Sequence, residues 1–291
     1  MVPFEYEAPG TIDEAIALLA KHRDEAKVLA GGQSLVPLLN YWLARPRAVL
    51  DINRLPLDGV RVEDGRLRLG ALTRHATLED SDAIAQACPV LAEAAALIGN
   101  VRVRALGTLG GSLAHADPAA ELPMAIVALD ARLTLQGRDG RRTVPAGEFF
   151  RGYLTTALEP VELLTEVDVP VTRGMGHAVE EFARRLGDFA LVAVTVLMGL
   201  DRAGRVDEAR VAFAGVAPTP IRAPGAEDML RGHEPTAERL SRAATVARDS
   251  LAPESDAFVS AAYRKHLAGV LARRALARAM TRAVESACAS A

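Results

Sequence analysis

The chain has 291 residues, of which 50% are hydrophobic and 24% charged, as is usual for a globular protein. Its 34 Lys and Arg residues nearly balance its 37 Asp and Glu residues, which argues against a dedicated nucleic-acid binder. The two cysteines, Cys88 and Cys288, form no Cys-x-x-Cys pattern. We therefore expect neither a disulfide framework nor a zinc or iron–sulfur site held by this chain alone.

Neither the N-terminus nor any apolar run predicts a targeting signal or a membrane span. The first residues include Glu5 and Glu7 in place of a basic stretch. The longest apolar stretch, residues 189–200, is too short to cross a bilayer. We therefore expect a cytoplasmic protein.

The first 56 residues predict the order helix, strand, loop, helix, strand. Thr11 and Glu14 have the spacing of a capping box at the start of the first helix. Residues 28–30 and 49–52 are short apolar strands, and Ser34 is the expected N-cap of the second helix. That helix is expected to bury a stripe formed by Leu35, Leu38, Leu39, Trp42 and Leu43.

Between residues 57 and 174, hairpins alternate with helices. Asp64-Gly65 and Asp139-Gly140 are the expected hairpin turns, and Gly99 is the expected end of a helix. The predicted elements are a hairpin at 60–69, a helix at 89–98, a loop at 100–118, a helix ending near 129, a hairpin at 132–144 and a strand at 163–171.

The rest of the chain is of a different kind. It predicts an antiparallel meander followed by Ala- and Arg-rich helices, with strands near 177–182, 190–200 and 206–216 and helices at 236–250 and 256–285. We therefore expect two domains, 1–174 and 175–291, the first with subdomains of about 1–56 and 57–174.

Two glycine-containing loops are the candidate ligand-binding features. The first is Ala30-Gly31-Gly32-Gln33-Ser34, and the second runs from Gly107 to Ser112, with Asp117-Pro118 after it. Glycine lets a backbone approach a phosphate closely, and successive amides and hydroxyls then serve as donors. Two such loops in one domain would suit a pyrophosphate, whereas a single Gly-Gly pair after a strand is usually a tight turn. Neither loop is a P-loop or a Gly-x-Gly-x-x-Gly fingerprint.

Two further groups of residues allow more than one interpretation. The arginines of the last predicted helix form either a solvated face or a surface for a partner subunit; they are Arg264, Arg273, Arg274, Arg278 and Arg282. The six histidines have no short metal-ligand spacing, and most are expected in loops or at the surface; they are His22, His75, His115, His177, His233 and His266.

The segments 29–35 and 107–113, with Asp117-Pro118, resemble the paired FAD motifs of one flavoprotein family. This family comprises the medium, FAD-binding subunits of molybdenum hydroxylases of the xanthine dehydrogenase and aerobic carbon monoxide dehydrogenase type. The resemblance covers nearly the whole chain, because it continues through residues 162–165, 187–190, 219–223 and 263–275.

The resemblance implies an α+β fold. Its N-terminal FAD-binding domain would be of the vanillyl-alcohol-oxidase-like (PCMH) type with two α/β subdomains, and its C-terminal domain an antiparallel sheet packed with helices. The two loops would hold the FAD pyrophosphate, and Asp188 and Phe189 would lie near the isoalloxazine ring. The implied FAD-binding residues are Leu29, Ala30, Gly31, Gly32, Gln33, Ser34, Leu35, Thr108, Leu109, Gly110, Gly111, Ser112, Asp117, Leu164, Asp188 and Phe189.

The resemblance also implies a function in electron transfer. A large partner subunit would oxidise the substrate at a molybdenum cofactor, and a small partner with [2Fe–2S] clusters would pass electrons to FAD in this chain. The complex would be a dimer of heterotrimers, and this chain would contain no catalytic acid–base group and no metal ligand. Gln33 occupies the first loop, so FAD is expected to bind non-covalently.

Two alternatives remain open at this stage. One is a free-standing FAD-dependent reductase or oxidase of the same superfamily. The other is a nucleotide-binding subunit that has lost flavin, against which the intact glycine loops argue. For Phe189, a core aromatic is the alternative to an aromatic shield over the flavin.

Overall fold

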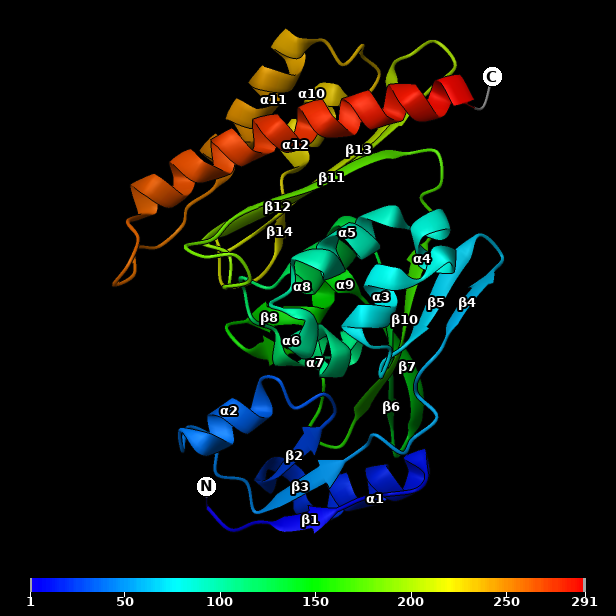
Figure 1. Ribbon diagram of the computed structural model, residues 1–291, viewed down its shortest axis with the longest axis vertical. Helices are drawn as coiled ribbons and strands as arrows, with labels where there is room; N and C mark the ends of the chain where they lie inside the picture. Colours follow the sequence, from blue (N-terminus) through cyan, green and yellow to red (C-terminus); the bar gives the residue numbers. More distant parts are fainter. Residues whose placement is uncertain (1, 290–291) are drawn as a thin grey trace.

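The computed structural model describes residues 2–289. Its N-terminal unit is a three-stranded parallel sheet of order β1-β3-β2, at the bottom of Figure 1. The elements are β1 (Glu5–Glu7), α1 (Ile12–His22), the 3-10 helix η1 (Arg23–Glu25), β2 (Ala26–Leu29), α2 (Leu35–Asn40) and β3 (Ala48–Asp51). The predicted order of helix, strand, loop, helix and strand is correct for α1, β2, α2 and β3, whereas β1 and η1 were not predicted. Thr11 caps α1 by accepting from the Glu14 amide at 3.1 Å, but the Glu14 carboxylate accepts from the Gly10 amide and not from Thr11.

Helix α2 differs from the prediction at both of its ends. Ser34 has helical backbone angles, and its side chain makes no capping hydrogen bond. The helix ends at Asn40, and Trp42 then adopts a positive φ of 64°. This turn breaks the helical spacing, so only Leu39 of the predicted stripe is fully buried, while Trp42 and Leu43 are 54% and 75% exposed.

The middle unit is a five-stranded antiparallel sheet of order β4-β5-β10-β6-β7, covered by short helices. Its first elements are β4 (Val60–Glu63), β5 (Arg66–Gly70), α3 (His75–Asp80), α4 (Asp82–Ala87), α5 (Pro89–Leu97), α6 (Val101–Leu106), α7 (Leu109–His115) and α8 (Glu121–Ala128). The others are β6 (Arg132–Gly137), β7 (Gly140–Pro145), α9 (Ala146–Phe149), β8 (Phe150–Gly152), β9 (Thr155–Thr156) and β10 (Leu163–Pro170).

Two local predictions for this unit need correction. Residues 100–118 were expected to be a loop, but they contain α6 and α7, because Asn100 and Thr108 accept hydrogen bonds from amides of the first turns. In the second hairpin Gly137 pairs with Gly140, so the turn lies one residue earlier than predicted. The turn at Asp64-Gly65 is confirmed, and both of its residues have positive φ.

The C-terminal unit is a four-stranded antiparallel sheet of order β11-β12-β13-β14 with helices on one face, and its first three strands and last two helices were predicted. Its elements are β11 (Gly176–Phe182), β12 (Val192–Leu200), β13 (Val206–Ala214), β14 (Ile221–Arg222), α10 (Pro224–Leu230), α11 (Ala237–Ser250) and α12 (Ala261–Ala289). The long helix α12 packs across β11 and β12 at the top of Figure 1. No helix within residues 2–289 is long and apolar enough to cross a membrane.

The C-terminal sheet is buried on both faces, which joins the middle and C-terminal units. Helix α8 packs against β12 and β13 from below, whereas α12 packs on the sheet from the other side. Accordingly, Leu197 and Ala212 belong to the core of the middle unit, while Val196 and Phe213 belong to the core under the C-terminal helices. Burial on both faces explains why β12 has an almost continuous apolar sequence.

Three of the five arginines of α12 make contacts inside the protein, so neither predicted interpretation holds for them. Arg264 donates to the carbonyl oxygens of Leu191 and Gly215 at 2.6 and 2.9 Å. Arg278 and Arg282 both pair with Glu93 on α5. These contacts fasten α12 to the sheet and to the middle unit, while Arg273 and Arg274 are exposed.

Candidate functional site

The two glycine loops meet where the N-terminal and middle units join. A Cβ atom on Gly31 would lie 2.7 Å from the Cα atom of Gly107 and would also collide with the Leu106 carbonyl oxygen. A Cβ atom on Gly111 would lie 3.9 Å from that of Ala30. In Figure 1, α2, which follows the first loop, lies next to α6 and α7, which flank the start of the second. The fold therefore brings together two loops that are more than 70 residues apart.

The first loop presents unpaired backbone donors. Within residues 2–289, the amides of Gly31, Gly32, Gln33 and Ser34 donate to no protein acceptor. Gly32 has a φ of +69°, which turns the chain, and the Gln33 side chain donates back to the Gly31 carbonyl oxygen at 2.9 Å. Successive free amides on a glycine turn form a concave set of donors that suits an anionic oxygen.

The second loop is held by the protein itself. The amides of Leu109 and Gly110 donate to the carbonyl oxygens of Thr73 and Ala71 at 2.9 and 2.8 Å. The Gly111 amide donates to the Thr108 hydroxyl at 3.1 Å, which caps α7. These amides are therefore already satisfied. Within the described chain the Ser112 hydroxyl makes no hydrogen bond, so it stays available to a ligand.

The His75 side chain packs against the second loop. Its side chain is 5% exposed, and its Nε2 atom lies 2.9 Å from the Thr108 carbonyl oxygen. Burial lowers the pKa of His75 to about 4, so the ring is neutral at pH 7 and donates from Nε2. His22 is buried as well, so these two are exceptions to the expectation that most histidines lie at the surface or in loops.

Asn53 and Arg74 connect the two loops, and the sequence analysis missed them. The Asn53 side-chain amide donates to the Ala30 carbonyl oxygen at 2.8 Å, and Arg74 donates to the Asn53 side-chain oxygen at 2.8 Å and to the Leu106 carbonyl oxygen. Both also line a cavity of about 580 Å³, whose other lining residues lie outside the two loops. The position of Asn53, just after a parallel strand, was the one available signal.

Several predicted site residues are largely packed inside the protein. Leu109 and Leu164 are 0% and 5% exposed and belong to the core of the middle unit. Leu29 and Leu35 are half-buried on either side of the first loop. The Asp117 carboxylate accepts from the Ala119 amide at 2.8 Å and so fixes the turn before α8. These side chains shape the walls and the backbone around the loops.

Asp188 and Phe189 lie on the segment between β11 and β12, and both are exposed. A Cβ atom on Gly187, which has a φ of +80°, would lie 2.5 Å from the Gly99 carbonyl oxygen, so this segment rests against the turn before α6. Phe189 is 60% exposed, which rules out a core aromatic. Helix α6 leads directly to Gly107, so this contact connects the segment to the second loop.

One buried and one half-buried carboxyl group lie close to the same region. Glu121 begins α8, four residues after Asp117, and is 5% exposed. Burial raises the pKa of Glu121 to about 7, with smaller contributions from the charges of Glu181 and Asp117. Burial also raises the pKa of Glu181 to about 7. Both groups therefore titrate close to neutral pH.

Comparison with known proteins identifies the family. Residues 2–172 match the FAD binding domain in molybdopterin dehydrogenase, and residues 177–279 match the carbon monoxide dehydrogenase flavoprotein C-terminal domain. The chain belongs to the FAD-binding subunits of the molybdenum hydroxylases. The family resemblance found in the sequence is thus confirmed.

Full-length relatives support the same assignment. The chain is 42% identical to the 6-hydroxypseudooxynicotine dehydrogenase complex subunit alpha of Paenarthrobacter nicotinovorans, over 96% of this chain and 95% of that protein. It is 40% identical to the carbon monoxide dehydrogenase medium chain of Hydrogenophaga pseudoflava, over 97% of this chain and 99% of that protein.

Solved structures show the same fold. Carbon monoxide dehydrogenase from Hydrogenophaga pseudoflava superposes with a TM-score of 0.94 at 41% identity, covering 97% of this chain and 99% of that chain. Quinoline 2-oxidoreductase from Pseudomonas putida 86 gives 0.92 at 34% identity, covering 97% and 98%. The predicted α+β fold, the FAD cofactor and the role as an oxidoreductase subunit are therefore confirmed.

Proposed function

We propose that the two glycine loops hold the pyrophosphate of FAD non-covalently, with the first loop donating from its backbone and the second from its side chains. The observation that carries this proposal is the contrast in pairing. Within residues 2–289 the first loop has four unpaired amides, from Gly31 to Ser34, whereas in the adjacent second loop every amide from Gly107 to Ser112 except that of Thr108 has a protein acceptor. A pyrophosphate at this junction would give those amides the partners they lack.

The other residues of the site have supporting roles in this proposal. Asn53 and Arg74 fix the spacing of the loops, and the hydroxyls of Ser34 and Ser112 add donors from either side. Bound FAD supplies one-electron and two-electron transfer, while the protein orients the ring and limits access to it. Phe189 and Asp188, on the exposed segment against Gly99, are the residues we assign to that access.

We further propose that electrons arrive from [2Fe–2S] clusters of a small partner, that the molybdenum cofactor lies in a large partner, and that two heterotrimers associate. The division into domains at about residue 175, and into subdomains near residue 57, follows the change from one sheet to the next. A cytoplasmic location agrees with the two free cysteines, Cys88 and Cys288. Mass measurement of the purified complex and cell fractionation test these points.

The loop assignment is tested by serine variants that cost the protein no hydrogen bond. Among the described residues the hydroxyls of Ser34 and Ser112 have no hydrogen-bond partner, so Ser34→Ala and Ser112→Ala remove only a contact to the ligand. Each should weaken FAD binding about tenfold, as expected for one hydrogen bond to a charged group. Equilibrium titration of the apoprotein with FAD measures the change.

Ser81→Ala is the matched control, because Ser81 also begins a helix without a side-chain capping bond. Unchanged FAD affinity in both loop variants would refute the assignment. Denatured holoprotein should release all its flavin, and flavin retained by the polypeptide would disprove non-covalent binding. The free-standing reductase is tested separately: the isolated chain should turn over no substrate of the complex, and the complex should co-purify with molybdenum and iron.

A further inference from the structure

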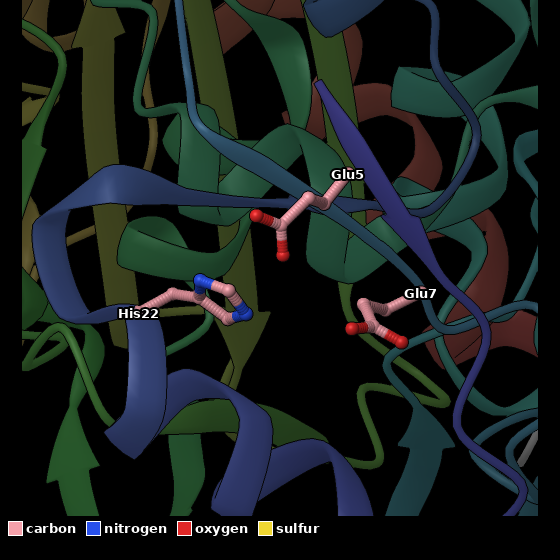
Figure 2. Close-up of side chains that lie close together, drawn as sticks. All are labelled: Glu5, Glu7 and His22. Atoms are coloured by element: carbon pink, nitrogen blue, oxygen red, sulfur yellow. The ribbon is translucent and has the colours of Figure 1, made fainter.

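A second cluster of ligand-type side chains lies in the N-terminal unit, outside the loop site. Glu5 and Glu7 come from β1, and His22 is the last residue of α1 (Figure 2). One ligand atom from each residue, a ring nitrogen and two carboxylate oxygens, lies within 4.8 Å of the others. Within residues 2–289 this is the one group of three or more such side chains at this spacing.

His22 is the member of this cluster whose environment calls for a partner. It is 6% exposed, and its Nε2 atom has no hydrogen-bond partner among the described residues. Figure 2 shows a ring nitrogen directed toward the space between the two carboxylates. Buried polar atoms in folded proteins are nearly always paired, so an unpaired nitrogen aimed at two carboxylates points to a bound ligand.

The strand geometry explains why both glutamates face His22. Side chains alternate along a strand, so Glu5 and Glu7 share one face of β1 while Tyr6 points to the other. Tyr6 confirms this alternation, because its hydroxyl donates to Asp51 at 2.6 Å. β1 is an edge strand of its sheet, and the last residue of α1, His22, lies beside the two glutamates.

The nearby cations do not occupy the carboxylates fully. Lys21 lies 3.8 Å from Glu7, and Arg47 lies 3.5 Å from Glu5. Both pairs are long and solvent-exposed, and ion pairs of this kind contribute little. The carboxylates therefore keep lone pairs that can be directed at an ion next to His22.

We propose that Glu5, Glu7 and His22 bind a divalent transition-metal ion, and that Zn²⁺ is the best match. One imidazole nitrogen with two carboxylate oxygens is a ligand set that suits Zn²⁺, with water completing a tetrahedral site. Mg²⁺ and Ca²⁺ prefer oxygen ligands alone. The ion ties β1 to the C-terminal end of α1 and so stabilises the unit that holds the first glycine loop.

The test is calorimetric titration of ZnCl₂ into the FAD-loaded chain after dialysis against a chelator. One saturable site is expected, and His22→Gln and Glu7→Gln should each weaken it at least tenfold. His233→Gln is the control, because His233 is exposed and outside the cluster, and it should bind as the wild type does. Excess MgCl₂ should not compete. Zn²⁺ should also raise the unfolding midpoint of the wild type by roughly 2–4 °C.

No saturable binding, or equal affinity in wild type and His22→Gln, would overturn the proposal. Because His22 is buried, circular dichroism of the metal-free variant must first show that it folds. If it does not fold, the double variant Glu5→Gln/Glu7→Gln replaces it, since both side chains are partly exposed. Wild-type Zn²⁺ affinity in that double variant would equally overturn the site.

Discussion

The two glycine loops look alike in the sequence, but their glycines have different roles in the structure. In the first loop Gly31 allows a close backbone contact with the other loop, and the amides of residues 31–34 have no partner in the part of the chain that the structure describes. In the second loop Gly110 packs on Ala71, and its amide donates to the Ala71 carbonyl oxygen. A glycine motif therefore indicates that another group approaches the backbone closely. The neighbouring residues determine whether the amides there pair with the protein or stay available to a ligand.

The largest effect is expected from Gly31→Ala. The new methyl group would collide with the Leu106 carbonyl oxygen and lie 2.7 Å from the Gly107 Cα atom, so the loops must separate. Loss of both halves of a clamp should reduce FAD affinity by on the order of 100-fold or more, since each lost charged contact is worth about 1.5–3 kcal/mol. Flavin absorbance per polypeptide after gel filtration measures the loss.

Gly152→Ala is the matched control, because a Cβ atom there meets nothing within 4 Å and should leave flavin content unchanged. If Gly31→Ala folds and retains full flavin, the loops do not act as a clamp. The difference in amide pairing between the two loops would then be unrelated to FAD binding.

The second prediction is that Gly110→Ala lowers the stability of the folded protein. In Gly110→Ala the methyl group would lie 2.6 Å from the Ala71 Cβ atom. Overpacking of this kind costs about 1–3 kcal/mol, so the apoprotein should unfold at lower urea concentration. A variant as stable as the wild type, but without flavin, would show that Gly110 faces the ligand and not Ala71.

Local patterns predicted a large part of the fold. The Thr11 cap, the Asp64-Gly65 turn and the C-terminal meander depend on neighbouring residues, and all three appear as expected. Helices α6 and α7 were missed because their capping residues, Asn100 and Thr108, lie in a glycine-containing stretch typical of a loop.

The site was predicted less completely, for a physical reason. The loops could be recognised as motifs, but the residues that join them act through tertiary contacts. Arg74 reaches Asn53 and Leu106, which are 21 and 32 residues away in the sequence. Likewise, the arginines of α12 find Glu93 only because the helix folds back onto α5. Sequence spacing cannot indicate such pairs.

The third prediction uses the buried carboxyl that follows the second loop. Burial raises the pKa of Glu121 from 4.5 to about 7, so the folded protein keeps a proton that the unfolded chain releases. Stability from this group is therefore complete below pH 4.5 and is lost as the pH rises to about 7. Glu121→Gln should match the wild type at low pH and exceed its stability by roughly 1–3 kcal/mol at pH 8.

Urea unfolding at several pH values measures this difference. His75 has the opposite effect on the pH dependence of stability, and His75→Gln measures its contribution separately. The pKa of His75 is lowered from 6.5 to about 4, so its contribution to stability is present above pH 6.5 and is lost as the pH falls toward 4. If Glu121→Gln leaves the pH dependence of stability unchanged, Glu121 is ionised in the folded protein and its burial is less complete than the structure indicates.

The smallest effect on stability is expected from Phe189→Ala. The Phe189 side chain is 60% exposed, so the substitution removes little buried surface. Its segment is fixed instead by Gly187 against Gly99, which connects it to the second loop and not to the core. Flavin content and the unfolding midpoint should therefore stay close to wild type. An aromatic side chain that shields the flavin should nevertheless control how fast oxygen or the electron acceptor reoxidises it, and a phenylalanine can do so only by its bulk. Stopped-flow reoxidation should change in Phe189→Ala and be restored in Phe189→Leu, which keeps much of the volume, whereas equal rates in all three proteins would show that Phe189 does not control access.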